Sequence, residues 1–258
     1  MPDLSGRTAI VTGAESGIGA ATATVLAKAG ATLAVFYYRD ENGAAETLAS
    51  VQAHGAKGAT IQVDVRDEAA VEHAFDEATS ALGIADILIN SAGLNQSHVD
   101  VANMSTEQWR RLIDTDLSGA FFTCRRFVRD LRAAAKAGRI VNVSSIHQDV
   151  MRAGAADYTS AKGGLRNLTE TLALECAPLK INVNAVAPGM ILTPMNARAE
   201  ADAKVRAAAA AHIPWGRAGT AAEVAEVIAF LASDAADYIT GTTVKIDGGL
   251  SLQLGLGA

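Results

Sequence analysis

The chain has 258 residues, half of them hydrophobic and 19% charged, and its formal net charge is −6 at pH 7. This apolar content excludes a disordered chain, and the length suits one large α/β domain or two small ones. The negative charge argues against a surface for nucleic acid or for an anionic membrane. We expect no secretory leader and no membrane span. The start is polar, and no run approaches the ~18 uninterrupted apolar residues of a span.

The numbers and positions of the cysteines and histidines argue against disulfide bonds and metal sites. Two cysteines, Cys124 and Cys176, are too few for a disulfide framework or a cysteine-based metal site. The histidines are scattered, with no pair at metal-ligand spacing. We therefore expect packing thiols, no metal site and a reducing, cytoplasmic location.

Short β-rich runs alternate with longer helical stretches over most of the chain. The predicted strands lie at Thr8–Thr12, Thr32–Tyr37, Ala59–Val65, Asp86–Asn90, Arg139–Ser144, Ile181–Ala187 and Thr242–Ile246. The predicted helices lie at Gly17–Ala29, Ala44–His54, Glu68–Leu82, Thr106–Ala137, Ala155–Cys176 and Ala221–Ser233. Nearly continuous apolar strands are typical of a parallel sheet that is buried on both faces. The alternation predicts one α/β domain over residues 1–258, a doubly wound, seven-stranded parallel sheet with helices on both faces.

Local signals mark two helix starts and one irregular segment. Ser105 with Gln108, and Thr220 with Glu223, have the spacing of capping boxes. The segment at about 190–213 breaks the alternation with one proline, Pro194, and an alanine-rich polar stretch. We interpret it as a mobile helical lid over a pocket, with an ordinary surface helix as the alternative.

A glycine-rich loop follows the first predicted strand and opens the first predicted helix. It reads Thr12-Gly-Ala-Glu-Ser-Gly-Ile-Gly19. Gly13, Gly17 and Gly19 allow a sharp turn and a close approach of the backbone to a diphosphate, and Ser16 and Ile18 lie between them. The helix N-terminus offers free N–H groups to that anion. In this position the loop predicts a Rossmann-type dinucleotide site, whereas a glycine triplet alone would indicate only a tight turn.

The end of the second predicted strand bears on the choice between NAD and NADP. An acidic residue there would bind the ribose 2′-hydroxyl and repel a 2′-phosphate. The chain instead has Phe36-Tyr-Tyr-Arg39, and its first carboxylate is at Asp40. Arg39 suits a phosphate, whereas Glu15 in the glycine loop opposes one. This pattern favours NADP, with NAD as the alternative.

Three residues have the pattern of a proton-transfer site. Tyr158 and Lys162 are four apart on a predicted helix and so share a face, and Ser145 ends the preceding strand. A phenol with a reference pKa of ~10 needs a depression of about 3 units, roughly 4 kcal/mol, to act as a base near pH 7. A neighbouring ammonium supplies such a pull. An isolated Tyr/Lys pair at this spacing is usually an ordinary pair on a helix surface. Here the glycine loop and Ser145 occur in the same chain, and this context favours a catalytic pair.

With these motifs in order, the chain resembles the short-chain dehydrogenase/reductase family from about Leu4 to Gly249. The resemblance implies that Ser145, Tyr158 and Lys162 are catalytic. It implies that Lys162 also holds the nicotinamide ribose and that Asn90 supports the sheet beside the cofactor. The implied cofactor-binding residues are Gly13, Ser16, Gly17, Ile18, Gly19, Arg39, Asp64, Val65, Asn90, Ala92, Gly93, Tyr158, Lys162, Pro188, Gly189, Ile191 and Thr193.

Two positions depart from the family pattern. The first is mild, because the family usually reads Asn-Asn-Ala-Gly where this chain has Asn90-Ser91-Ala92-Gly93. The fourth catalytic residue of the family is an Asn on the long middle helix, where this chain has Asp116 in Asp116-Leu-Ser-Gly-Ala-Phe121. A carboxylate accepts hydrogen bonds but has no amide to donate, and beside Lys162 it would partly neutralise the pull on Tyr158. We expect the proton relay to survive with an altered pH dependence.

Within the family, the stretches Ser144-Ser-Ile-His147, Asp157–Ala173 and Met190-Ile-Leu-Thr-Pro-Met-Asn196 resemble bacterial glucose 1-dehydrogenases. That resemblance implies that Ser145, Tyr158, His147 and Asn95 face a sugar, although His147 has an equally good interpretation as a loop-packing residue. The alternative substrate is a 3-oxoacyl or acetoacetyl thioester. An alternative of another class is a cofactor-binding regulator with impaired catalysis, which only Asp116 favours.

The chain ends in an apolar, glycine-containing tail. Leu250, Leu252, Leu254 and Leu256 would be exposed to water in an isolated chain. The family is usually tetrameric, which implies a homotetramer here. We expect the tail at 250–258 to lie at a subunit contact, and we expect no nucleic-acid or membrane partner.

Overall fold

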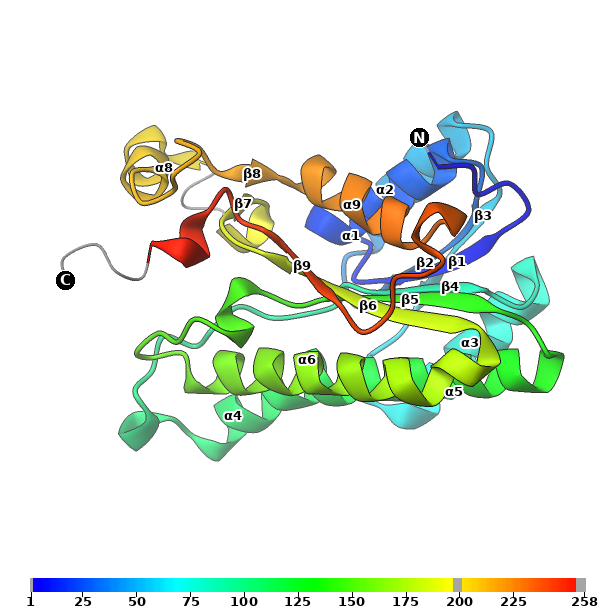
Figure 1. The fold of residues 1–258 in the computed structure, drawn as a ribbon, viewed down its shortest axis with the longest axis horizontal. Coiled ribbons are helices and arrows are strands. Elements are labelled where there is room, and N and C mark those ends of the chain that lie inside the picture. The colour runs from blue at the N-terminus through cyan, green and yellow to red at the C-terminus, as the bar shows by residue number, and fades with distance from the viewer. Residues whose placement is uncertain (1, 197–200, 254–258) are drawn as a thin grey trace.

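Seven parallel strands form the main sheet of the computed structural model, which describes residues 2–196 and 201–253. The strand order is β3-β2-β1-β4-β5-β6-β9 (Figure 1). The strands are β1 (Thr8–Thr12), β2 (Thr32–Tyr37), β3 (Gly58–Gln62), β4 (Ile87–Asn90), β5 (Gly138–Val143), β6 (Ile181–Pro188) and β9 (Thr243–Ile246). The order runs outward from β1 in one direction and from β4 in the other, so the topological switch point lies between these two strands. Ligands of doubly wound sheets bind at such a point, beyond the carboxyl ends of the strands.

The predicted strands are confirmed to within one residue at their ends, with one exception. β3 ends at Gln62, three residues before the predicted end at Val65. Asp64 Oδ1 accepts the backbone N–H of Arg66 at 3.0 Å, and this local turn takes the chain away from the sheet. The apolar run therefore continues past the last paired residue of the strand.

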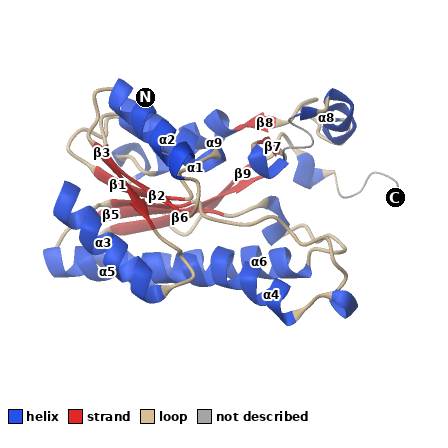
Figure 2. Ribbon diagram, turned by 180° about the vertical axis from the view of Figure 1, so that it is seen from behind, coloured by secondary structure: helices blue, strands red, loops and turns tan. Residues whose placement is uncertain are grey.

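Helices cover both faces of the sheet (Figures 1 and 2). One layer holds α1 (Gly17–Lys28), α2 (Glu41–Ala53) and α9 (Ala221–Leu231). The other holds α3 (Glu68–Leu82), α4 (Thr106–Ile113), α5 (Gly119–Ala134) and α6 (Ala156–Cys176). Both predicted capping boxes are present, at Ser105 with Gln108 and at Thr220 with Glu223. The doubly wound fold class is confirmed.

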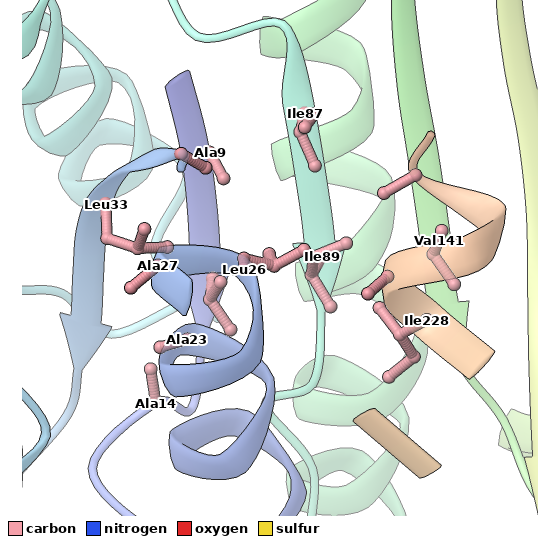
Figure 3. Close-up of a cluster of buried hydrophobic side chains, with 14 of the residues drawn as sticks. Ala9, Ala14, Ala23, Leu26, Ala27, Leu33, Ile87, Ile89, Val141 and Ile228 are labelled. Atoms are coloured by element: carbon pink, nitrogen blue, oxygen red, sulfur yellow. The ribbon is translucent and has the colours of Figure 1, made fainter. Parts of the chain in front are cut away.

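Each helix layer packs on the sheet through a separate apolar cluster. In the α1–α9 layer, Leu26 and Ile228 meet Ile89 and Val141 of the sheet, and small side chains such as Ala23 let α1 approach closely (Figure 3). The opposite cluster includes Phe36, Phe75 and Phe127, which are buried between the sheet and α3 and α5. This double burial explains why the strands are nearly continuous apolar runs.

The long middle helix predicted at Thr106–Ala137 is interrupted. A π-helical segment, Asp114–Ser118, separates α4 from α5, and the helix ends at Ala134 rather than Ala137. The end is set by Ala135, which adopts a left-handed backbone with φ of 51°. Such single π turns are frequent at functional sites, and this one contains Asp116.

The segment at about 190–213 forms a second, small structure at the end of the sheet. β7 (Ile191–Leu192) pairs in parallel with β8 (Gly219–Thr220), a ladder that the sequence did not predict. The helix α8 (Ala203–Ala210) lies inside the predicted alanine-rich stretch. Positions 197–200 of the expected lid and positions 254–258 of the expected tail lie outside the described residues. Within the described residues, no helix is long and apolar enough to cross a membrane.

Candidate active site

A cavity of about 580 Å³ opens at the carboxyl ends of the strands, beside the switch point. Its wall is built by the segments that follow β1, β2, β3, β4, β5 and β6, together with α4, the π-helical segment and α6. It runs from the Tyr38 side of the sheet to the turn around Met195. The predicted site residues in this wall are Gly13, Ser16, Gly17, Ile18, Arg39, Asp64, Val65, Ala92, Gly93, Asp116, Ser145, Tyr158, Lys162, Pro188, Gly189, Ile191 and Thr193.

Four predicted site residues lie outside the cavity wall. Gly19 lies behind the glycine loop, where a Cβ would overlap the carbonyl oxygen of Gly13. Asn90 is buried within the sheet. The His147 ring lies edge-on to Tyr158, with 6.0 Å between ring centres, and its Nδ1 bonds the Val150 carbonyl at 2.8 Å. Asn95 does not line the cavity, but its Nδ2 donates to the carbonyl of the wall residue Met195 at 3.3 Å.

The glycine loop fits a dinucleotide in two respects. A Cβ on Gly13 would come within 2.7 Å of the Ala92 Cα, so the loop after β1 lies against the loop after β4 with no room for a side chain. The N-cap of α1, Ser16, makes no side-chain capping bond, whereas Asp40, Asp67 and Ser105 cap the helices that follow them. The first-turn N–H groups of α1 are thus left for an anion such as a cofactor diphosphate.

The residues Ser145, Tyr158 and Lys162 converge at the other end of the cavity. Tyr158 and Lys162 lie one turn apart on α6, and the Lys162 Nζ is 5.5 Å from the centre of the Tyr158 ring. Ser145 caps the short 3-10 turn Ile146–Gln148, and its hydroxyl accepts the His147 N–H at 3.2 Å. β5 and α6 therefore place a hydroxyl, a phenol and an ammonium in one wall.

Lys162 is buried and held by one hydrogen-bond acceptor and one ion-pair partner. Its Nζ donates to the Val143 carbonyl at 3.1 Å and faces the Asp116 Oδ2 at 3.1 Å. An ammonium has three N–H donors, so one is left for a ligand in the cavity. Burial alone would lower the pKa of Lys162, but the charges of Asp116 and Tyr158 outweigh it and raise that pKa. The amine therefore stays protonated.

Asp116 is fully buried in the π-helical segment. Its Oδ1 accepts the Leu94 N–H at 2.8 Å, which ties the middle helix to the loop after β4. Burial raises the pKa of Asp116, while the Lys162 ammonium and the Leu94 N–H act in the opposite direction. Asp157, a second buried carboxyl, adds to the upward shift. The catalytic end thus contains a buried ion pair with one further acidic group nearby.

A network of neutral polar side chains supports the sheet behind the site. Asn90 Nδ2 donates to the Asn142 Oδ1 at 2.9 Å, and the Thr123 hydroxyl donates to the Asn90 Oδ1 at 2.7 Å. Asn142 in turn donates to the Thr169 hydroxyl on α6 at 2.9 Å. Cys124 is buried here, and burial raises the pKa of its thiol to about 12, which suits a packing thiol. These bonds link β4 and β5 to α5 and α6, the helix with Tyr158 and Lys162.

The cavity wall also includes residues that the sequence did not single out. Tyr38 and Arg66 line its far end, and Leu94 and Met195 line the catalytic end. Arg66 could have been predicted as a site residue from the sequence. It lies two residues after Asp64, just past a predicted strand whose carboxyl end faces the site. Met195 had no comparable sequence signal, since its position depends on the turn after β7.

Comparisons with known proteins agree with this geometry. A family model described as enoyl-(acyl carrier protein) reductase matches residues 13–251. 3beta-hydroxysteroid dehydrogenase 1 of Eggerthella lenta is 41% identical over 253 residues, 98% of this chain and 97% of the relative. Glucose 1-dehydrogenase 2 of Bacillus subtilis is 36% identical over 250 residues, 97% of this chain and 96% of the relative. A provisionally assigned 2-deoxy-d-gluconate 3-dehydrogenase of Agrobacterium tumefaciens, solved with bound NADP, has a TM-score of 0.87 and 35% identity, covering 96% of this chain and 97% of its own.

This fold and site define a dinucleotide-dependent oxidoreductase. The class follows from the doubly wound sheet, from the open N-terminus of α1, and from Tyr158 and Lys162 on α6. The matches extend over nearly the whole chain. The chain belongs to the short-chain dehydrogenase/reductase family, and it is an NAD(P)-dependent enzyme that interconverts an alcohol and a carbonyl.

Proposed function

We propose that Ser145, Tyr158 and Lys162 carry out the proton transfer of this reaction on a secondary alcohol. The observation that carries the proposal is their convergence in one cavity wall, with Lys162 fixed between Asp116 and the Val143 carbonyl. The bound nicotinamide supplies the hydride chemistry when it is present. Ser145 orients the substrate oxygen by a hydrogen bond, and Tyr158 takes the alcohol proton or returns it to the carbonyl.

The lysine acts on this step through its charge. The positive Nζ of Lys162 stabilises the phenolate that forms when Tyr158 loses its proton. Its remaining N–H is available to a ribose hydroxyl of the cofactor. Asp116 holds the ammonium in place and, because it is negative, limits the strength of this effect.

We expect Asp116→Asn to move the rising limb of the pH–rate profile for alcohol oxidation by about one pH unit toward lower pH. While Asp116 is ionised, its carboxylate offsets part of the potential that Lys162 exerts on Tyr158, and the amide of the variant removes this negative charge. Phenolate formation then requires a less alkaline solution. Burial raises the pKa of Asp116, so the wild-type carboxyl takes up a proton as the pH falls, and the two enzymes converge in acid.

Measurement of kcat/KM over about pH 5 to 10 checks this shift. Asp76→Asn is the matched control, because Asp76 is an exposed carboxylate that pairs with Arg126 on α5, outside the cavity wall. An unchanged profile and turnover in Asp116→Asn would leave Asp116 with a structural role only.

For the substrate, we propose the hydroxyl of an aldose or a related polyol. The similarity to a glucose 1-dehydrogenase supports this, as do the polar groups of Ser145 and Asn196 in the cavity wall. A bulky apolar alcohol is the second candidate, because Leu94 and Met195 line the same end and a hydroxysteroid dehydrogenase is 41% identical.

A substrate panel separates these candidates. Glucose, other aldoses, a 3beta-hydroxysteroid and an acetoacetyl thioester are each assayed with NAD, NADP or their reduced forms. We expect turnover with glucose or another aldose. No turnover with any aldose would contradict the sugar proposal, and turnover with the thioester would favour the reductase alternative.

We propose NADP as the preferred cofactor. Arg39 lies in the cavity wall at the end of β2, and no carboxylate among the described residues comes within ion-pair distance of its guanidinium. This uncompensated charge suits a 2′-phosphate. The cytoplasm remains the proposed compartment, supported by the two free, buried cysteines.

We also propose a homotetramer with the tail at 250–258 in a subunit contact. Leu174 on α6 is 80% exposed and Tyr238 before β9 is fully exposed, so an apolar and an aromatic side chain are presented to solvent at these two places. Light scattering should give about four times the 26.5 kDa chain mass. Deletion of 250–258 should lower it, and an unchanged mass would remove the tail from the contact.

A further inference from the structure

Two arginines converge on one hydroxyl at the far end of the cavity. The Arg39 Nη2 donates to the Tyr38 Oη at 3.0 Å, and the Arg66 Nη2 donates to the same oxygen at 2.9 Å. The two nitrogens are therefore held within about 6 Å of each other. All three side chains line the cavity. Two guanidinium groups aimed at one oxygen atom form a concentrated positive site.

The two guanidinium groups are held in place in different ways. Asp64 binds Arg66 through its Nε, at 2.9 and 3.1 Å, and through its Nη2, at 2.5 Å. This interaction lowers the pKa of Asp64. Arg39 stacks on the Tyr38 ring, with its Cζ 4.6 Å from the ring centre, and the Arg66 Cζ is 5.4 Å from the same centre. Arg66 is thus oriented by a carboxylate and Arg39 by an aromatic face.

The position of this cluster within the cavity identifies the part of the cofactor that it meets. The glycine loop and the N-terminus of α1 lie in the middle of the cavity and suit the diphosphate. Tyr158 and Lys162 lie at the nicotinamide end. The opposite end, beyond β2 and β3, is left for the adenosine half, and Tyr38, Arg39 and Arg66 are there.

We propose that Arg39 and Arg66 together bind the 2′-phosphate of NADP, so that Arg66 is a second cofactor-specificity residue. The inference rests on the proposed function, because it concerns the cofactor of that reaction. Tyr38 Oη accepts the two N–H groups that a phosphate oxygen would otherwise accept. A dianionic phosphate binds to paired guanidinium groups far more strongly than a neutral ribose hydroxyl does.

Glu15 is the acidic group that opposes this site. Its Oε1 accepts the Tyr38 backbone N–H at 3.3 Å, and its Oε2 is buried with no hydrogen-bond partner among the described residues. The carboxylate thus stands beside the phosphate position and weakens phosphate binding by repulsion. Glu15→Gln should strengthen the preference for the 2′-phosphate by a few-fold.

A pair of cofactor fragments tests the proposal without any substrate. Adenosine 2′,5′-bisphosphate and 5′-AMP differ only in the 2′-phosphate, so the ratio of their dissociation constants reports on this group alone. We expect the wild type to bind the bisphosphate at least about tenfold more tightly in calorimetric titrations. Arg39→Ala and Arg66→Ala should each reduce this ratio about tenfold and leave 5′-AMP affinity within about twofold. Arg129→Ala is the matched control, because Arg129 is a 61% exposed arginine outside the cavity wall.

Two results would overturn the proposal. If Arg66→Ala weakens both fragments equally, Arg66 contacts the adenosine that they share rather than the phosphate. If the ratio in Arg66→Ala equals that of the wild type, Arg66 has no role in the choice of cofactor. Failure of the proposed function can be distinguished from failure of this 2′-phosphate proposal. In that case no substrate is turned over with either cofactor, whereas the fragment ratios still respond to both arginine variants.

Discussion

Tyr158→Phe is expected to lower kcat by about a thousandfold, because it removes the hydroxyl that we propose transfers the proton and leaves the ring in place. This corresponds to about 4 kcal/mol of transition-state stabilisation. The ring contacts with His147 and the neighbouring Lys162 do not involve the hydroxyl. The free energy of unfolding should therefore stay close to the wild-type value. The dissociation constant of the cofactor should stay within about twofold of that of the wild type.

Steady-state assays and fluorescence titration of the reduced cofactor measure these two quantities separately. Tyr238→Phe is the matched control, because Tyr238 is fully exposed, lies outside the cavity wall, and should keep full activity when its hydroxyl is removed. A kcat within about tenfold of the wild type would show that another group supplies the proton. The same variant separates an enzyme from a cofactor-binding regulator, whose output would not depend on the phenol.

The sheet and its helix layers could be predicted because their signals are local. Strands buried on both faces must be apolar throughout, and the runs Thr8–Thr12 and Thr32–Tyr37 match β1 and β2 residue for residue. Ser105 and Thr220 bond to the N–H groups of residues only three positions away, so their capping boxes could be recognised by spacing alone.

Features that depend on tertiary contacts could not be predicted in this way. The π-helical turn at Asp114–Ser118 places Asp116 against Lys162 and the Leu94 N–H, residues that are distant in the sequence. Nothing in the local pattern of an amphipathic helix indicates such a turn. The ladder of β7 and β8 likewise joins residues that are separated by α8.

The candidate site shows the same division. The Tyr158–Lys162 spacing is fixed by one helical turn, and the glycine loop by its place after β1, so both were predictable from the sequence. The contact of Arg66 with Tyr38 depends on the pairing of β3 with β2, which brings residues 28 positions apart together. Sequence reasoning therefore found Arg39 but missed its partner.

Gly19→Ala is expected to weaken NADP binding by about a hundredfold or more and to lower the free energy of unfolding by about 1–3 kcal/mol. A Cβ on Gly19 would overlap the Gly13 carbonyl oxygen and come within 2.8 Å of its carbon and 3.0 Å of the Ala14 Cα. All three atoms belong to the backbone, so no side-chain rotation relieves the contact. The first turn of α1 and the glycine loop must therefore move apart, although Gly19 itself does not line the cavity.

Thermal unfolding and calorimetric titration of the cofactor measure the two effects. Gly163→Ala is the matched control, because a Cβ there meets nothing closer than the Gln148 carbonyl oxygen at 3.9 Å. This change lies inside α6 and should leave cofactor binding intact while adding about 0.5–1 kcal/mol of stability. If Gly19→Ala unfolds earlier but binds NADP as tightly as the wild type, the loop is needed for packing and not for the diphosphate. A joint loss of both would show that the close contact between α1 and the loop shapes the anion site.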